Sequence, residues 1–177
     1  MSWPSVASKA ADILESHACL WDNQGPLALI DARRVFRDLP VAHLATTRSD
    51  GGPHLIPLWF VWREEAIYVS CRRDSSTWRN VERDPRVTLS FSLGTKWREY
   101  AGILVVGRAE PLVTEHPALR GVMTEWYEKY KLLLTGGGFQ DYAQQVESPG
   151  MLRVRPERIA AWNHAVPASP LAEAGGA

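Results

Sequence analysis

Apolar and polar positions along the chain change from a helical to a strand spacing near residue 40. Residues 5–17 and 27–39 carry apolar side chains at helical spacing, and the second stretch stops at Pro40. Beyond that proline, short apolar runs alternate with turn residues, as is typical of β-strands. The pattern predicts six strands, the last of them interrupted by Pro156, over residues 41–47, 55–62, 66–71, 86–93, 101–113 and 151–162.

Turn and cap residues indicate how the early strands connect. Residues 49–52 read Ser-Asp-Gly-Gly, which predicts a tight hairpin, and residues 63–65 predict a second turn. Residues 75–83 predict a short polar helix with Ser75 or Ser76 as its N-cap. Inside the fifth strand two glycines mark bends or close backbone approach: Gly102 and Gly107.

A later helix begins near Pro117 and ends before the glycines at 136–138, which precede a short helix over 139–146. The apolar stripe of the helix that begins near Pro117 consists of Leu119, Val122, Met123, Trp126, Tyr130 and Leu133. The tail from residue 167 is rich in small residues, and we expect it to be mobile. Short strands joined by tight turns favour a closed antiparallel barrel over a doubly wound sheet.

Composition narrows the class of protein. The chain has 177 residues, 45% of them hydrophobic, which suits one soluble domain. Twenty basic residues balance twenty acidic ones, which argues against an electrostatic nucleic-acid or membrane binder. No apolar run approaches the roughly 20 residues of a membrane span, and the N-terminus lacks a signal-peptide pattern. Two cysteines make no disulfide framework, so we expect a reducing cytoplasm.

Sequence motifs for the common catalytic sites are absent. The chain has no glycine-rich dinucleotide loop, P-loop, zinc-protease motif or nucleophile elbow. Its five histidines have no metal-ligand spacing, and Cys71, at the end of a predicted buried strand, is best read as a packed thiol. The sequence therefore predicts no metal site and no catalytic nucleophile.

One polar constellation does point to a ligand. Residues 68–80 join the third strand to the polar helix and place Arg72, Arg73 and Arg79 beside several hydroxyls at a helix N-terminus. Backbone N–H groups, the helix dipole, hydroxyl donors and guanidinium groups together favour an anion. The alternative interpretation is a capped, solvated helix with no ligand.

Four segments in order resemble the pyridoxamine 5′-phosphate oxidase-like split-barrel superfamily. They are residues 41–60, residues 67–71 (Ile-Tyr-Val-Ser-Cys), residues 79–87 and residues 107–110 (Gly-Arg-Ala-Glu), with 155–162 similar to the family's last strand. The resemblance covers about residues 40–164. It implies a mainly β (α+β) fold, a six-stranded antiparallel split barrel with flanking helices, and a homodimer that binds FMN or the deazaflavin coenzyme F-420.

The resemblance also implies a division of the chain and a set of cofactor contacts. Residues 1–39 would be an N-terminal helical extension, 40–164 the cofactor-binding domain and 165–177 a flexible tail. The second strand would position the cofactor ring through Pro57, Leu58, Trp59 and Phe60. The phosphate would be held by Ser70, Cys71, Arg72, Arg73, Ser75, Ser76, Thr77 and Arg79. Three tryptophans are candidates for stacking, although core packing is the better interpretation of each: Trp59, Trp62 and Trp78.

Departures from the family pattern bear on the reaction. True pyridoxamine phosphate oxidases carry Arg and Lys where this chain has Leu55 and Phe60, and an Arg-Lys pair where it has Ser76 and Thr77. Their terminal Trp-Arg-Leu is also missing, so vitamin B6 oxidation is not expected. Residues 57–60 (Pro-Leu-Trp-Phe) are closer to the F-420-dependent branch, although that branch generally has a basic residue at the position of Thr77.

The leading functional hypothesis is an oxidoreductase that passes a hydride from reduced F-420 to a small conjugated acceptor, with the cofactor carrying the chemistry. One alternative is an FMN-dependent oxidase or reductase of the same fold. Another is a non-catalytic protein that binds a flavin or a tetrapyrrole. The last is an interaction module whose groove is filled by its own tryptophans.

Overall fold

The fold is described by a computed structural model covering residues 29–96, 100–113, 115–131 and 149–163. The helices predicted over 5–17 and 139–146, and the tail from residue 165, lie outside these ranges. The elements in chain order are α2 (Leu29–Phe36), β1 (Ala42–Thr47), β2 (Pro53–Leu58), β3 (Phe60–Arg63), β4 (Ala66–Ser70), α3 (Ser76–Arg83), β5 (Arg86–Leu93), β6 (Ala101–Val113), η3 (Pro117–Leu119), α4 (Arg120–Tyr130) and β7 (Gly150–Asn163). None of the described helices is long and apolar enough to cross a membrane.

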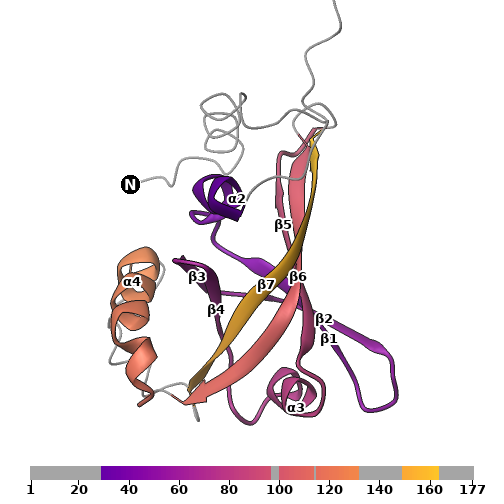
Figure 1. Cartoon of the computed structure of the whole chain (residues 1–177), viewed down its shortest axis with the longest axis vertical. Coiled ribbons are helices and arrows are strands. Elements are labelled where there is room, and N and C mark those ends of the chain that lie inside the picture. Colours follow the sequence, from indigo (N-terminus) through magenta and orange to yellow (C-terminus); the bar gives the residue numbers. More distant parts are fainter. Residues whose placement is uncertain (1–28, 97–99, 114, 132–148, 164–177) are drawn as a thin grey trace, which may run out of the picture.

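Seven antiparallel strands form one sheet in the order β2-β1-β5-β6-β7-β4-β3. The two edge strands, β2 and β3, are separated in the chain by Trp59 alone. A sheet whose opposite edges are joined by one residue must curl until those edges meet, and Figure 1 shows this curvature. The predicted class, an antiparallel split barrel with flanking helices, is confirmed.

The number of strands differs from the prediction because the apolar run over 55–62 forms two strands. The β2 segment pairs with β1 up to Leu58, whereas β3 pairs with β4 from Phe60 onward. Between them the Trp59 carbonyl accepts a hydrogen bond from the Ser70 N–H at 2.8 Å, and the Trp59 ring stacks on Tyr130. The chain therefore changes partner at Trp59 without a turn residue to mark the change.

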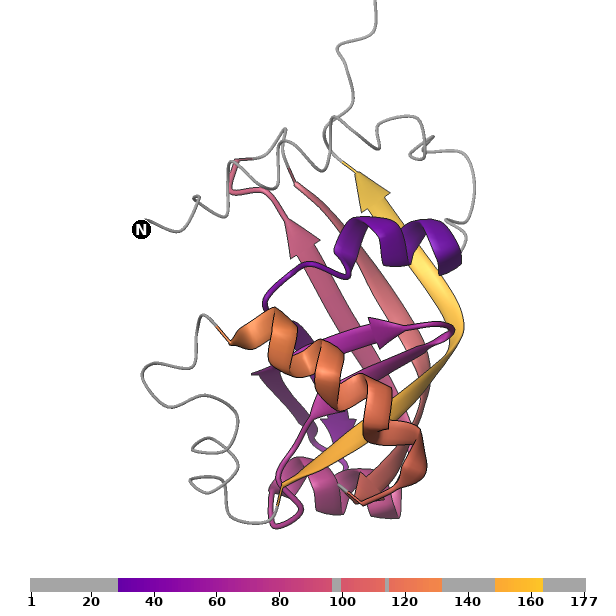
Figure 2. The same ribbon diagram turned by 90° about the vertical axis from the view of Figure 1, so that its left-hand side faces the viewer.

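Two apolar cores hold the sheet, one on each of its faces. Inside the barrel, Phe36 of α2 and Phe60 of β3 both contact Phe91, and all three are essentially buried. On the outside, Trp126 of α4 packs in a second core that covers β3 and β4. In Figure 2, α2 lies in front of the upper part of the sheet and α4 in front of its lower part. Helix α2 thus shares the barrel core, and the domain boundary at residue 39 stays a prediction.

Helix α4 also holds the crossing from β2 to β3 by hydrogen bonds. The Tyr130 hydroxyl accepts from the Phe60 N–H at 2.9 Å and lies 2.9 and 3.0 Å from the carbonyl oxygens of Pro40 and Phe60. Lys129 Nζ donates to the carbonyls of Arg37 (2.7 Å) and Phe60 (3.0 Å) and sits 3.6 Å from the centre of the Phe60 ring. The edge groups of Phe60 are therefore satisfied by side chains in place of a neighbouring strand.

The long strands β6 and β7 pair continuously around a bulge. Their register shifts between Val106 and Gly107, where Gly107 lies opposite Pro156. A Cβ on Gly107 would lie 2.2 Å from the Arg155 carbonyl oxygen, so the close approach predicted for this glycine is confirmed. Pro156 lies at the register shift, where a bulge leaves a backbone position without a ladder partner. The strand therefore continues through Pro156, whereas the sequence predicted an interruption.

Candidate functional site

Helix α3 is fastened to the β1–β2 hairpin by a seam of polar contacts. The seam consists of Thr77 Oγ1 with His54 Nε2 at 3.1 Å, Asn80 Nδ2 donating to Thr46 Oγ1 at 3.1 Å, and Arg83 donating to the Thr47 carbonyl. Thr77 and Asn80 are 1% and 5% exposed. A buried hydrogen-bonded pair fixes its partners because losing either one leaves an unsatisfied polar group. The seam therefore sets the position of α3 against the hairpin.

The start of α3 is capped as predicted by Ser75. Its Oγ accepts from the Trp78 N–H at 3.1 Å and donates to the Arg72 carbonyl at 2.7 Å. Cys71 is buried, with Sγ 3.2 Å from Ser75 Oγ, and burial raises the pKa of its thiol. Cys71 is thus a packed thiol, as its sequence position indicates, and the Ser75 hydroxyl is already engaged in the cap.

The arginines near the helix start have different surroundings. Arg72 donates to both carboxylate oxygens of Asp74, and this pairing holds the pKa of Asp74 below its usual range. Arg79 donates to the Asp74 carbonyl at 2.6 Å and to Ser76 Oγ at 3.3 Å, and has no carboxylate partner within the described residues. Arg73 packs its stem near Gly150, on the side of β7. Of the three predicted arginines, Arg79 is the one that contacts the Ser76 hydroxyl without forming an ion pair within the described residues, although its charge helps to lower the pKa of Asp74.

A basic groove of about 600 Å³ lies between the hairpin and α3. It is lined by Arg48, Ser49, His54, Ser76, Arg79, Asn80 and Arg83. Arg48 forms an ion pair with Asp50 at 2.9 Å, whereas Arg83, like Arg79, has no carboxylate partner in the ranges that the structure covers. Two guanidinium groups that form no ion pair within the described residues, beside serine hydroxyls, give the groove the chemistry that favours an anion.

The groove overlaps the predicted phosphate site only in part. Ser76 and Arg79 line it, whereas Thr77 faces inward and the remaining predicted residues lie outside its lining. Asn80 and Arg83 were missed, although they follow Ser76 and Arg79 at helical spacing and the same face predicts them. Arg48, Ser49 and His54 come from the hairpin and carry no sequence signal, because their approach to α3 depends on tertiary packing.

The free edge of β2 lies beside this groove and offers few hydrogen-bond donors. The Arg48 N–H bonds to the Gly52 carbonyl at 2.8 Å, and bonded and non-bonded pairs alternate from there along the hairpin. The backbone groups of Pro53, Leu55 and Pro57 therefore point away from β1. Proline has no N–H, so Leu55 supplies the one donor among these three, and its side chain is 60% exposed.

The four residues expected to position a cofactor ring span the point where β2 ends and β3 begins, and their surroundings differ. Pro57 is exposed on the β2 edge, and Leu58 is half-buried against the barrel core. Trp59 stacks on Tyr130 with ring centres 4.7 Å apart, and Phe60 is fully buried in the barrel. Phe60 is thus enclosed by core residues and does not line a surface. The roles of all four residues toward a cofactor stay predictions.

The other two candidate stacking residues pack in the core. Trp62 and Trp78 are 3% and 6% exposed, and both belong to the barrel core cluster. The Trp78 indole N–H donates to Glu82 at 2.8 Å within α3. Core packing, the preferred interpretation of these tryptophans, is confirmed for both.

Comparison with known proteins agrees with the barrel fold. The family model for pyridoxamine 5′-phosphate oxidase matches residues 30–163. A conserved hypothetical protein of Mycobacterium tuberculosis is 27% identical, with 74% of this chain and 83% of that chain covered at a TM-score of 0.60. An F-420 reductase is 22% identical (71% and 93% covered, TM-score 0.56). A FAD-binding protein of Mesorhizobium loti is 19% identical (77% and 95% covered, TM-score 0.58). No curated protein matches the chain.

The extent of the family match decides the class. It spans the described sheet and all three α-helices, from α2 to β7, so the chain belongs to the pyridoxamine 5′-phosphate oxidase family. The resemblance deduced from the sequence is confirmed. The likeness to the F-420 reductase and the FAD-binding protein concerns the fold alone.

Proposed function

We propose that this protein is a cytoplasmic oxidoreductase that binds reduced coenzyme F-420 and transfers a hydride to a small conjugated acceptor. The observation that carries the proposal is the basic groove beside the free edge of β2. An anionic group in the groove and a planar ring along the edge would together account for both features. Membership of the pyridoxamine 5′-phosphate oxidase family, whose match covers residues 30–163, supports the proposal.

The residues present fit the phosphate of such a cofactor. Arg79 and Arg83 form no ion pair with a carboxylate within the described chain, and Ser76 Oγ stands in the same groove. Guanidinium groups bind phosphate through parallel N–H donors, which is stronger than a neutral contact. The missing basic residue at Thr77 is thus offset by Arg83, one helical turn beyond Arg79.

The β2 edge fits the ring. Leu55 and Pro57 offer exposed apolar surface, and the free Leu55 N–H and neighbouring carbonyls offer hydrogen-bond partners to the ring's polar rim. When bound, a deazaflavin would supply the hydride chemistry. The chain's own contribution is to hold the phosphate in the groove, to align the ring on β2 and to cover one ring face with apolar atoms.

A titration separates the cofactor classes. We expect the ligand-free protein to bind F-420 at micromolar or lower concentration, with quenching of its eight tryptophans as the signal. Binding of FMN alone would move the activity to the FMN-dependent alternative. Binding of neither would contradict the oxidoreductase proposal and leave a ligand-binding or structural role.

Variants of the groove test the assignment of the phosphate. Arg79→Ala and Arg83→Ala should each weaken binding of F-420, or of FMN if that is the cofactor, about tenfold or more, since a charge-assisted hydrogen bond is lost. Riboflavin lacks the phosphate, so its weaker affinity should be unchanged in both variants. Arg120→Ala, which removes an exposed arginine on α4, is the matched control. Equal loss for riboflavin would show that the substitutions act on the fold.

We also propose that the protein is a homodimer and that the part of the outer sheet face around Leu104 forms the interface. A cross-strand row on that face, from β2 to β7, carries no charge: Pro57, His43, Ser90, Leu104 and Ala160. Leu104, next to the β7 end of this row, is 38% exposed. The cores of protein interfaces are depleted in charged side chains, and exposed apolar patches mark interaction sites.

Sedimentation checks the dimer. The wild-type chain should sediment as a dimer and Leu104→Glu as a monomer, because the substitution buries a carboxylate in an apolar contact. Val113→Glu is the control, since Val113 is similarly exposed (41%) but lies at the far end of β6. A monomeric wild-type protein would contradict the proposal.

A further inference from the structure

Three arginines form a cross-strand row on the outer face of the sheet, away from the basic groove. Arg86 of β5 lies opposite Arg108 of β6, and Arg108 lies opposite Arg155 of β7. All three are exposed. Neighbouring strands are roughly 4.8 Å apart, so three guanidinium groups emerge within about 10 Å. We call Arg86, Arg108 and Arg155 the arginine row.

The arginine row is only partly neutralised. Arg86 is bound by Asp84, with nitrogen-to-oxygen distances of 2.7 to 3.2 Å. Arg86, through this hydrogen bonding, lowers the pKa of Asp84 to about 2, and the charge of Arg108 adds to the effect. The side chains of Arg108 and Arg155 make no hydrogen bond or ion pair within the described residues. Like charges directly opposite on neighbouring strands destabilise a sheet, so the fold bears a cost that an anion would remove.

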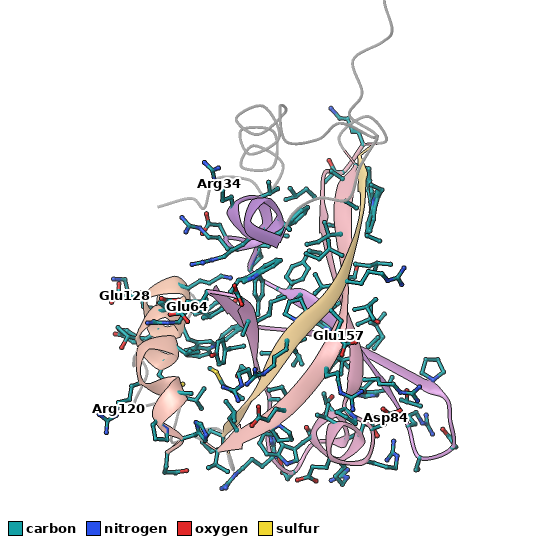
Figure 3. The ribbon with its side chains drawn as sticks, viewed as in Figure 1. Arg34, Glu64, Asp84, Arg120, Glu128 and Glu157 are labelled. Atoms are coloured by element: carbon teal, nitrogen blue, oxygen red, sulfur yellow. The ribbon has the colours of Figure 1, made fainter. Side chains whose placement is uncertain are left out.

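A groove of about 470 Å³ adjoins the row on the side of β7. It is lined by three arginines, two glutamates, Tyr68 and two small or cyclic residues: Arg63, Glu64, Glu65, Ala66, Tyr68, Arg153, Arg155 and Pro156. Figure 3 shows Glu64 and Asp84 on opposite sides of the β7 ribbon. Arg155 of β7 lines the groove and also lies opposite Arg108, so it belongs to both the groove and the row. Arg153 is held by Glu110 on the neighbouring strand, so Arg155 is the arginine of this groove that faces the row without a carboxylate.

We propose that Arg108 and Arg155 form a second anion site, which takes the phosphate group of a small phosphorylated molecule whose remainder enters the adjoining groove. Two guanidinium groups at strand spacing match the oxygens of a doubly charged tetrahedral anion. The site is separate from the groove between α3 and the hairpin, since none of its residues lines that groove. It needs neither the cofactor nor the activity proposed above.

Thermal unfolding of the full chain with inorganic phosphate as the probe tests the proposal. Phosphate should raise the Tm by roughly 2–4 °C over sodium chloride at the same ionic strength. The shift should persist in Arg79→Ala/Arg83→Ala, which disables the other groove, and should disappear when Arg108→Gln/Arg155→Gln is added. In chloride at low ionic strength, adding Arg108→Gln/Arg155→Gln should not lower the Tm relative to the same chain without these two substitutions, because the opposed charges are gone.

A control variant and the remaining outcomes of this experiment decide whether the anion site exists. Arg120→Gln removes an exposed arginine of α4, labelled in Figure 3, that belongs neither to the arginine row nor to the lining of the adjoining groove, and it should leave the phosphate shift intact. Equal Tm values in phosphate and chloride, a shift that survives Arg108→Gln/Arg155→Gln, or a shift lost with Arg79 and Arg83 would each overturn the site. So would a lower Tm of Arg108→Gln/Arg155→Gln in chloride, or a change in its oligomeric state with the phosphate shift retained, since these would assign the row a structural or interface role.

Discussion

Replacing Phe60 with alanine is expected to lower the free energy of unfolding by about 3–5 kcal/mol, the range for deleting a buried phenylalanine. The Phe60 side chain is fully buried, packs edge-on against Phe91 with ring centres 5.0 Å apart, and lies under the Lys129 ammonium. It sits at the residue where β3 begins, so the cavity would open beside the joined edges of the sheet. Urea unfolding measured by tryptophan fluorescence gives the value.

Leu55→Ala is the control for that substitution. Leu55 lies on β2, on the other side of the same crossing, but is 60% exposed, so its change should stay within about 0.5 kcal/mol. A loss below about 1 kcal/mol for Phe60→Ala would show that the barrel closes over the missing ring. The claim that this ring holds the two edges together would then be wrong.

Gly107→Ala is expected to destabilise the protein by about 1–3 kcal/mol through overpacking. Its Cβ would lie 2.2 Å from the Arg155 carbonyl oxygen and 3.2 Å from Pro156 Cα. Both are backbone atoms of the paired strand, so relief requires β6 and β7 to separate at the bulge. The same unfolding measurement applies.

Gly52→Ala is the matched glycine control. A Cβ there would meet the Asp50 carboxylate at 3.0 Å, which is the end of an exposed side chain that can rotate away. Its effect should be small. If both alanine variants were equally stable, the bulge at Gly107 would not depend on close strand approach.

The local sequence pattern predicts those parts of the fold that are determined by residues close to them in the chain. The bounds of β5 and β6 follow from alternation between turn residues, and Ser75 caps α3 because a serine before a polar helix satisfies its first N–H groups. The division of residues 55–62 does not follow from pattern. Apolar residues run through Trp59, and the change of partner there is imposed by the closing of the sheet and by Tyr130, 70 residues after Phe60.

The candidate site was predictable to a similar depth. The helix face that carries Ser76 and Arg79 could be found from the strand-to-helix junction, and Arg83 follows from the same helical spacing. The inward orientation of Thr77 could not be found, because it depends on His54 of a different element. The pairing of Arg72 with Asp74 is local, and the Arg-Arg-Asp order contains it, yet composition alone counts Arg72 as a free cation.

The donor-poor edge of β2 has a consequence for how the protein behaves at high concentration. An incoming strand would need regularly spaced N–H groups to build a ladder, and prolines remove those at positions 53 and 57. A barrel with a free strand edge would otherwise present a template for intermolecular sheet growth and aggregation. Here the free edge of β2 can bind a small ligand through the Leu55 N–H and the neighbouring carbonyls. It offers another polypeptide too few N–H donors to extend the sheet.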